Sequence, residues 1–151
     1  MKKIYLLVFT LLAFVGVSFG QVTVTNPANT TPVLAATYGS LAAAITALNT
    51  ITAISGPVII TLDPVNPQTA PAGGYAIQFT AVTTLANNIT IAGSNNTITA
   101  FTPQAAGNLN DAIFKLIGVD FITIQNFTMQ ENAANVTTTA ALAAFSCMVK
   151  F

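Results

Sequence analysis

The sequence predicts an all-β domain in which short parallel strands stack as the coils of a solenoid. Charged residues make up only 5% of the 151 positions, and Thr and Asn supply much of the polarity. Thr favours strands and Asn tolerates tight turns. The triplet Ile-Thr-Ile occurs at 89–91 and again at 122–124, and a period of about 20 to 50 residues is typical of solenoids. A β-sandwich built from similar short strands is the alternative.

The N-terminus predicts export. Two lysines precede an apolar run over 4–17, and the small residues Ser18 and Gly20 stand where a signal peptidase cleaves. A transmembrane anchor needs about 20 apolar residues, and this run is shorter. We therefore expect a secreted chain, extracellular or on the outer cell surface. The sequence divides into a signal peptide (1–20), a lead-in strand and loop (21–37) and the coils (38–151).

The charge pattern excludes several classes of function. The chain has no His and no Trp, and its formal net charge is zero. A basic nucleic-acid binder, an acidic disordered tail and any His-based metal site or catalytic triad are therefore excluded.

A strand and a helix are expected before the repeats. Residues 21–25 alternate Val with polar residues, which is typical of a half-buried strand. Ser40 is a suitable N-cap for a helix over 41–48. Leu41, Ile45 and Leu48 follow helical spacing and would form its buried face.

The repeats begin with an apolar strand over 58–62, which ends at Asp63-Pro64. Each Ile-Thr-Ile triplet follows an apolar segment, at 76–79 in one unit and at 112–115 in the next. A second Thr-apolar pair follows each triplet, at 97–98 and at 128–129. The strand over 58–62 lies about 30 residues before the first triplet, so it could hold the same place in an earlier unit.

Five motifs in order carry a resemblance to a known family. They are the helix over 41–48, G-P-V-I-I-T-L-D-P at 56–64, G-G-Y-A-I at 73–77, I-T-I-A-G-S-N-N-T-I at 89–98 and F-I-T-I-Q-N-F-T-M at 121–129. Over about residues 35–132 the chain resembles the N-terminal portion of a right-handed parallel β-helix of the pectin-lyase-like superfamily. It is also similar to secreted bacterial surface proteins. The resemblance implies that the helix caps the open end of the first coil.

A stacked arrangement assigns the repeated residues to two sides of the strands. The inward row would be Ile89, Ile91, Ile98, Ile122, Ile124 and Met129, with Thr90 and Thr123 facing outward. Asn95, Asn96 and Asn126 lie where the chain leaves a strand, and Asn there can adopt left-handed backbone angles or bind the next coil. We expect these three to be structural, with sugar binding as the alternative.

Few side chains could support catalysis. Family members use a basic residue with calcium-binding carboxylates, or clustered Asp residues, and neither set matches this chain. Asp111 and Asp120, with Lys115 between them, are the nearest candidates, but they are expected to be solvated turn residues. Asp63 and Glu131 are expected at strand ends, and Cys147 has no His to activate it. No catalytic, cofactor-binding or metal-binding residue is assigned, and no cofactor is expected.

Two functions remain open. The first is a structural, adhesive or carbohydrate-binding module of the cell surface, whose partner is a polysaccharide or surface glycan. The second is the N-terminal fragment of a polysaccharide lyase or glycoside hydrolase. Catalysis needs titratable groups gathered in a cleft, which this composition hardly provides, so we expect a chain that is not an enzyme.

The last expectation concerns the C-terminus. Residues 140–151 are almost continuously apolar, without a Gly or Pro turn or a closing helix. We expect a strand that is cut off within a coil and a structure that the sequence defines poorly beyond about residue 133. We also expect self-association through this uncapped end.

Overall fold

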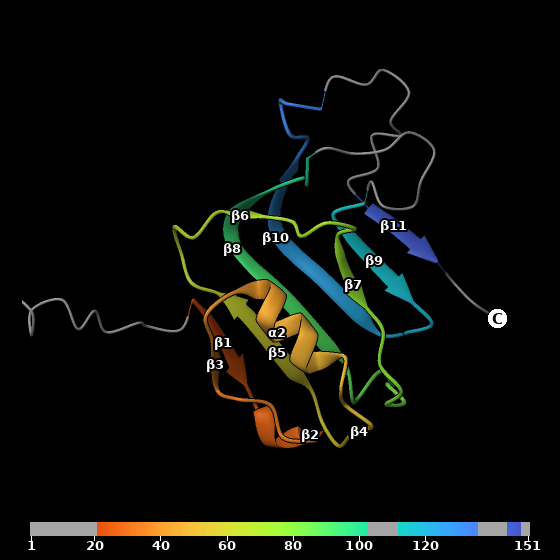
Figure 1. Ribbon diagram of the computed structural model, residues 1–151. Helices are drawn as coiled ribbons and strands as arrows, with labels where there is room; N and C mark the ends of the chain where they lie inside the picture. The colour runs from red at the N-terminus through yellow and green to blue at the C-terminus, as the bar shows by residue number, and fades with distance from the viewer. Residues whose placement is uncertain (1–20, 103–111, 136–144, 149–151) are drawn as a thin grey trace, which may run out of the picture.

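A computed structural model describes residues 21–102, 112–135 and 145–148 (Figure 1). Its elements are β1 (Val22–Thr25), a short 3-10 helix η1 (Pro27–Asn29), β2 (Thr30–Thr31), β3 (Thr37–Tyr38), α2 (Leu41–Leu48), β4 (Ala53–Ile54), β5 (Val58–Leu62), β6 (Gln68–Thr69), β7 (Tyr75–Ile77), β8 (Ile89–Thr99), β9 (Phe114–Ile117), β10 (Ile122–Gln130) and β11 (Phe145–Met148). The predicted strands over 21–25 and 58–62 and the predicted helix are confirmed as β1, β5 and α2.

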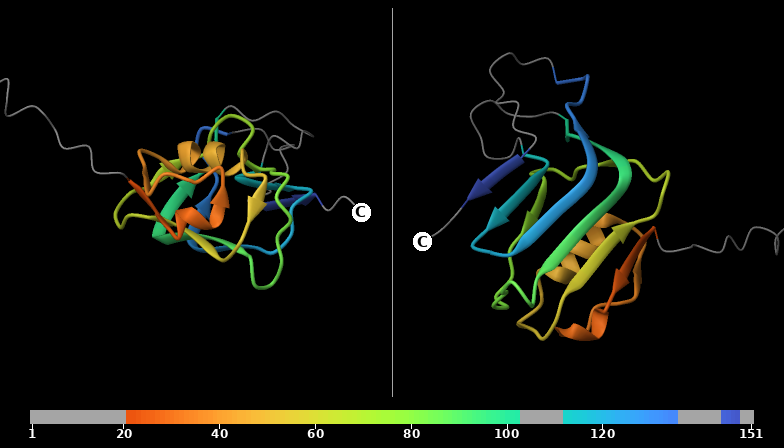
Figure 2. Two further views of the ribbon diagram at one scale, coloured as in Figure 1. Left: turned by 90° about the horizontal axis from the view of Figure 1, so that it is seen from below. Right: turned by 180° about the vertical axis from the view of Figure 1, so that it is seen from behind.

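The strands form three sheets. The largest has the order β10-β8-β5-β1-β3, with β6 also paired to β8. A second sheet has the order β11-β9-β7, and β2 pairs with β4 in the third. The helix lies over one face of the large sheet, and the second sheet lies beside the helix with β7 nearest to it (Figures 1 and 2).

The predicted repeat is present as a parallel ladder in the large sheet. Val58 of β5 pairs with Ile89 of β8, which in turn pairs with Ile122 of β10. Two residues further along, Ile60, Ile91 and Ile124 line up in the same way. The strand over 58–62 therefore does belong to an earlier unit, as the spacing predicted.

The expected all-β solenoid is wrong. The described residues form a mixed α/β fold, with one α-helix and with both parallel and antiparallel strand pairs. β1 joins the large sheet antiparallel to both β5 and β3, and β2 and β4 are also antiparallel. Residues 78–88 contain no strand, so the described part of the chain closes no solenoid. The alternation over 21–25 could indicate a strand but not its direction. By pairing antiparallel with β5, β1 forms hydrogen bonds with N–H and C=O groups at the β5 edge, which in a solenoid would pair with a preceding coil.

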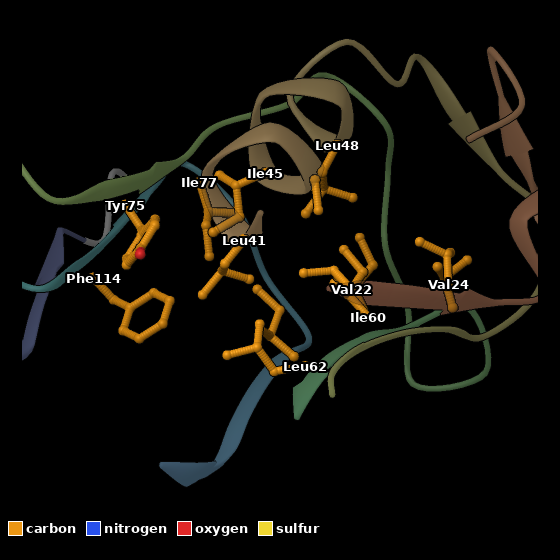
Figure 3. Packing of buried hydrophobic residues seen from close by; sticks show 14 of the residues in the cluster. Val22, Val24, Leu41, Ile45, Leu48, Ile60, Leu62, Tyr75, Ile77 and Phe114 are labelled. Carbon is orange, nitrogen blue, oxygen red and sulfur yellow. The ribbon is translucent and has the colours of Figure 1, made fainter. Parts of the chain in front are cut away.

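The helix supplies one side of the core. The Ser40 hydroxyl accepts a 3.1 Å hydrogen bond from the Ala43 amide and so caps the helix N-terminus. Leu41, Ile45 and Leu48 are buried and point toward residues of β1, β5 and β7 (Figure 3). Their predicted role as the buried face of the helix is confirmed. The helix covers a sheet face, so its expected role as the cap of an open solenoid end is wrong too.

The inward row is buried to different depths along the sheet. Ile89, Ile91 and Ile98 of β8 are fully buried, as expected. In β10, Ile122, Ile124 and Met129 pack against the same core but remain partly exposed. The described residues contain no helix long and apolar enough to cross a membrane.

Candidate functional site

The buried Asn96 is a polar side chain whose hydrogen bonds are made to the protein backbone. Its side chain is only 5% exposed. The amide nitrogen donates to the backbone carbonyls of Asp63 and Gly93, both at 2.8 Å, and the amide oxygen accepts from the Asn66 N–H at 2.6 Å. The side chain thus joins the β8 unit to the preceding one, and both of its N–H groups are used within the fold.

Other polar side chains make the same kind of bond between units. Asn49 donates to the Ala76 carbonyl and accepts from the Gln78 amide, both at 2.8 Å. Further examples are Asn29 to Pro57, Ser94 to Leu62, Asn132 to Ala100 and Asn135 to Phe101, all donating to backbone carbonyls 28 to 34 positions away. Buried carbonyls need such partners, so these side chains stabilise the fold.

Two of the predicted asparagines have a left-handed backbone conformation. Asn95 has a φ of 62° within β8 and Asn126 a φ of 59° within β10, where the register between the two strands shifts. Asn tolerates this region better than other residues that carry a side chain. The left-handed backbone predicted for Asn95 and Asn126 and the bond to a neighbouring unit predicted for Asn96 are confirmed. The expectation that all three lie where the chain leaves a strand is wrong, because they lie inside β8 and β10.

The charged candidates are spread over the molecule. Asp63 follows β5, Glu131 follows β10, and Lys115 lies within β9. Asp120 lies in the turn before β10, as expected, whereas Asp111 falls outside the described residues. Among the residues that the structure describes, no three Cys, Asp or Glu side chains are grouped closely enough to hold a metal ion.

The C-terminal candidates lie in the second sheet. Residues 145–148 form β11, which runs parallel to β9 with Cys147 opposite Leu116. Residues 136–144 and 149–151, and with them most of the expected cut-off strand, lie outside the described part of the chain.

A surface depression of about 360 Å³ lies beside Asp120. We call it the Asp120 depression; it is lined by residues 79–83 on one side and 118–120 on the other. The Thr83 hydroxyl donates a 2.7 Å hydrogen bond to the Asp120 backbone carbonyl and ties the two sides together. The only charge in this lining is the Asp120 carboxylate.

Strained backbone and exposed apolar side chains adjoin the depression. Phe121 has a φ of 49°, which is unusual for a bulky residue. Its carbonyl accepts from the Ile89 amide at 3.2 Å, which holds the backbone in place, while its side chain is left 50% exposed. Val82, in the lining, is 79% exposed. Strain of this kind is often retained where a side chain is needed at the surface.

A second, smaller depression of about 240 Å³ lies between α2 and residues 71–76. Tyr75 lines it, yet its side chain is buried against Phe114, with the ring centroids 5.2 Å apart. Burial raises the pKa of the Tyr75 hydroxyl to about 12, so it stays protonated at neutral pH. This tyrosine therefore supports the core.

Sequence reasoning placed Asp120 in a turn but missed the segment over 79–83 and the left-handed backbone of Phe121. The Phe residue gave no signal, because a left-handed conformation is not expected for its side chain. The contact between 79–83 and 118–120 joins positions far apart in the sequence and depends on the pairing of β8 with β10.

The chain was compared with protein-family profiles, with curated proteins and with solved structures, and none of the three gave a match. The resemblance to the pectin-lyase-like superfamily therefore rests on its motifs alone.

Proposed function

We propose that this chain is an exported module of the cell surface that serves as a rigid scaffold and binds a neutral polysaccharide. The observation that carries the proposal is the Asp120 depression, in which one carboxylate lies among apolar and Thr side chains. Export is supported by the basic and apolar pattern of the first 20 residues.

The lining of the depression suits a sugar ring. Sugar hydroxyls are hydrogen-bond donors, and a carboxylate is a strong acceptor for them. The apolar C–H face of the same ring can pack on an exposed apolar surface such as Val82. Small-molecule sites combine apolar walls with a few placed polar groups, and residues 79–83 and 118–120 supply both.

The charge of the lining favours an uncharged glycan. No Lys or Arg lines the depression, and its single charged group is negative. An acidic polymer would bring like charge next to Asp120, which is unfavourable.

A glycan array, followed by titration calorimetry with the best neutral ligand, tests the proposal. The exported form should bind a neutral polysaccharide, and Asp120→Asn should weaken binding about tenfold, as expected for loss of a charge-assisted hydrogen bond. Asp63→Asn is the matched control, since Asp63 lies outside the depression and should leave the affinity unchanged. Absence of binding to every neutral glycan, or equal loss in both variants, would contradict the proposal.

A further inference from the structure

A loop over residues 78–88 is longer than its counterpart in the next unit. In the earlier unit, twelve positions separate Ile77 of β7 from Ile89 of β8. Their register partners, Leu116 of β9 and Ile122 of β10, are only six positions apart. The loop therefore has six additional residues, and part of it forms one wall of the Asp120 depression. Insertions within a repeat often belong to its binding face.

Hydrogen bonds within the loop fix its shape. The Thr84 amide donates to the Asn87 carbonyl, and the Asn87 amide donates to the Thr84 hydroxyl, both at 3.0 Å. The Asn88 side chain donates to the Leu85 carbonyl at 2.8 Å. Val82 comes just before this turn and is 79% exposed. A surface that is ordered before binding loses less conformational entropy when a ligand arrives, so Val82 is suited to contact a ligand.

The polar side chains of the depression offer a ligand acceptors and no free hydroxyl proton. Three lining residues have polar side chains, namely Thr80, Thr83 and Asp120. The Thr83 hydroxyl donates to the Asp120 backbone carbonyl at 2.7 Å, and the Thr80 hydroxyl donates to the Ile51 carbonyl at 3.5 Å. A carboxylate can only accept. The ligand must therefore supply the donors for these side chains.

An acetamido group matches this lining better than a sugar hydroxyl does. A hydroxyl both donates and accepts, and the lining side chains have no proton to give to its oxygen. An amide N–H only donates, and the methyl of an acetamido group is apolar. One substituent thus provides a donor for the Asp120 carboxylate and an apolar group for the exposed Val82.

We infer that the polysaccharide bound in the Asp120 depression carries acetamido groups, as chains of neutral N-acetylated amino sugars do. The N–H donates to the Asp120 carboxylate, the methyl packs on Val82, and the acetamido carbonyl stays hydrogen-bonded to water. Removing the methyl from water is favourable, and a hydrogen bond to a carboxylate is charge-assisted. The inference rests on the proposed function and narrows its ligand to one class of sugar.

Titration calorimetry of the exported form with matched pairs of oligosaccharides tests the inference. The two members of a pair have the same length and linkage, and they differ only in having an acetamido group or a hydroxyl at one ring position. Pairs of gluco and of galacto configuration are both measured. The N-acetylated member should bind about tenfold tighter, which is the discrimination that one apolar group in a pocket can give.

Val82→Ala isolates the contact with the methyl group. It should reduce the preference for the N-acetylated member to about threefold or less, because most of the apolar contact is lost. Val33→Ala is the same substitution at an exposed position outside the depression, and it should leave the preference unchanged. An equal preference in the two variants would overturn the inference.

The outcomes separate this inference from the proposed function. Neutral glycans that bind more weakly to Asp120→Asn, but show no preference within any pair, would overturn the inference alone. A deacetylated, positively charged chain that binds as tightly as the N-acetylated one would also overturn it, since attraction to the carboxylate would then suffice. Absence of binding to every glycan would overturn the inference and the proposed function together.

Discussion

The side-chain amide of Asn96 donates a 2.8 Å hydrogen bond to the backbone carbonyl of Asp63, 33 positions earlier in the chain. This bond joins one unit of the ladder to the next, and the Asn96 side chain that makes it is buried. It explains how a chain with few charged residues can be rich in polar ones and still fold around an apolar core: amide side chains satisfy backbone groups that the short strands leave unpaired.

Asn96→Ala should lower the free energy of unfolding by about 2–4 kcal/mol. The change removes the partner of the buried Gly93 carbonyl and of the partly buried Asn66 N–H and Asp63 carbonyl, and each such loss costs about 1–3 kcal/mol when the group is fully buried. Urea denaturation followed by circular dichroism measures this. Asn87→Ala is the control, with an expected change within about 0.5 kcal/mol at a partly exposed site. Equal losses of unfolding free energy at both positions would show that the Asn96 bonds between units do not stabilise the fold.

Ile45→Asp should cost several kcal/mol, because it places an unpaired charge where the helix packs on the sheet. Thr46→Asp, one residue further on the exposed side of the helix, is the control and should change stability by less than about 1 kcal/mol. An unchanged melting temperature for Ile45→Asp would mean that the helix is not packed as described.

Local patterns predicted the elements well. Alternating Val and Thr identified β1, the Ser40 cap and the spacing of three apolar residues identified α2, and the apolar run identified β5. The repeat of Ile-Thr-Ile also predicted which residues pair across β8 and β10. In each case the signal is periodicity within a few residues, or a recurrence of the same side chains.

The arrangement of the elements could not be predicted in the same way. Strand periodicity is identical in parallel and antiparallel pairs, so the direction of β1 was not determined by its sequence. The Asp120 depression depends on a contact between 79–83 and 118–120, and the neighbouring Phe121 is left-handed. These features arise from tertiary packing that overrides local preference.

Gly93→Ala should destabilise the β8–β10 pair by about 2–4 kcal/mol. A Cβ at Gly93 would lie 2.3 Å from the Phe127 ring and 2.5 Å from the Asn126 carbonyl oxygen, so both neighbours would have to move. At Gly39 a Cβ meets nothing within 4 Å. Gly39→Ala should therefore be neutral or slightly stabilising, by up to about 1 kcal/mol. Thermal denaturation of the two variants measures the difference, and a Gly93→Ala protein as stable as Gly39→Ala would contradict the close approach of β10.

Tyr75 should make stability depend on pH in the alkaline range. Burial raises its pKa from 10.0 to about 12 in the folded chain, so the folded state holds this proton more tightly than the unfolded state does. The contribution is fully present below pH 10 and is lost as the pH rises from 10 toward 12. It amounts to about 2–3 kcal/mol, at 1.36 kcal/mol for each unit of pKa. Tyr75→Phe removes the ionisable group and should reduce the alkaline loss of stability by that amount, while Tyr38→Phe, at a partly exposed position, serves as the control. Urea denaturation at pH 9 and pH 12 measures the difference, and parallel pH curves for the unmodified protein and Tyr75→Phe would show that Tyr75 ionises as freely in the folded chain as in the unfolded one.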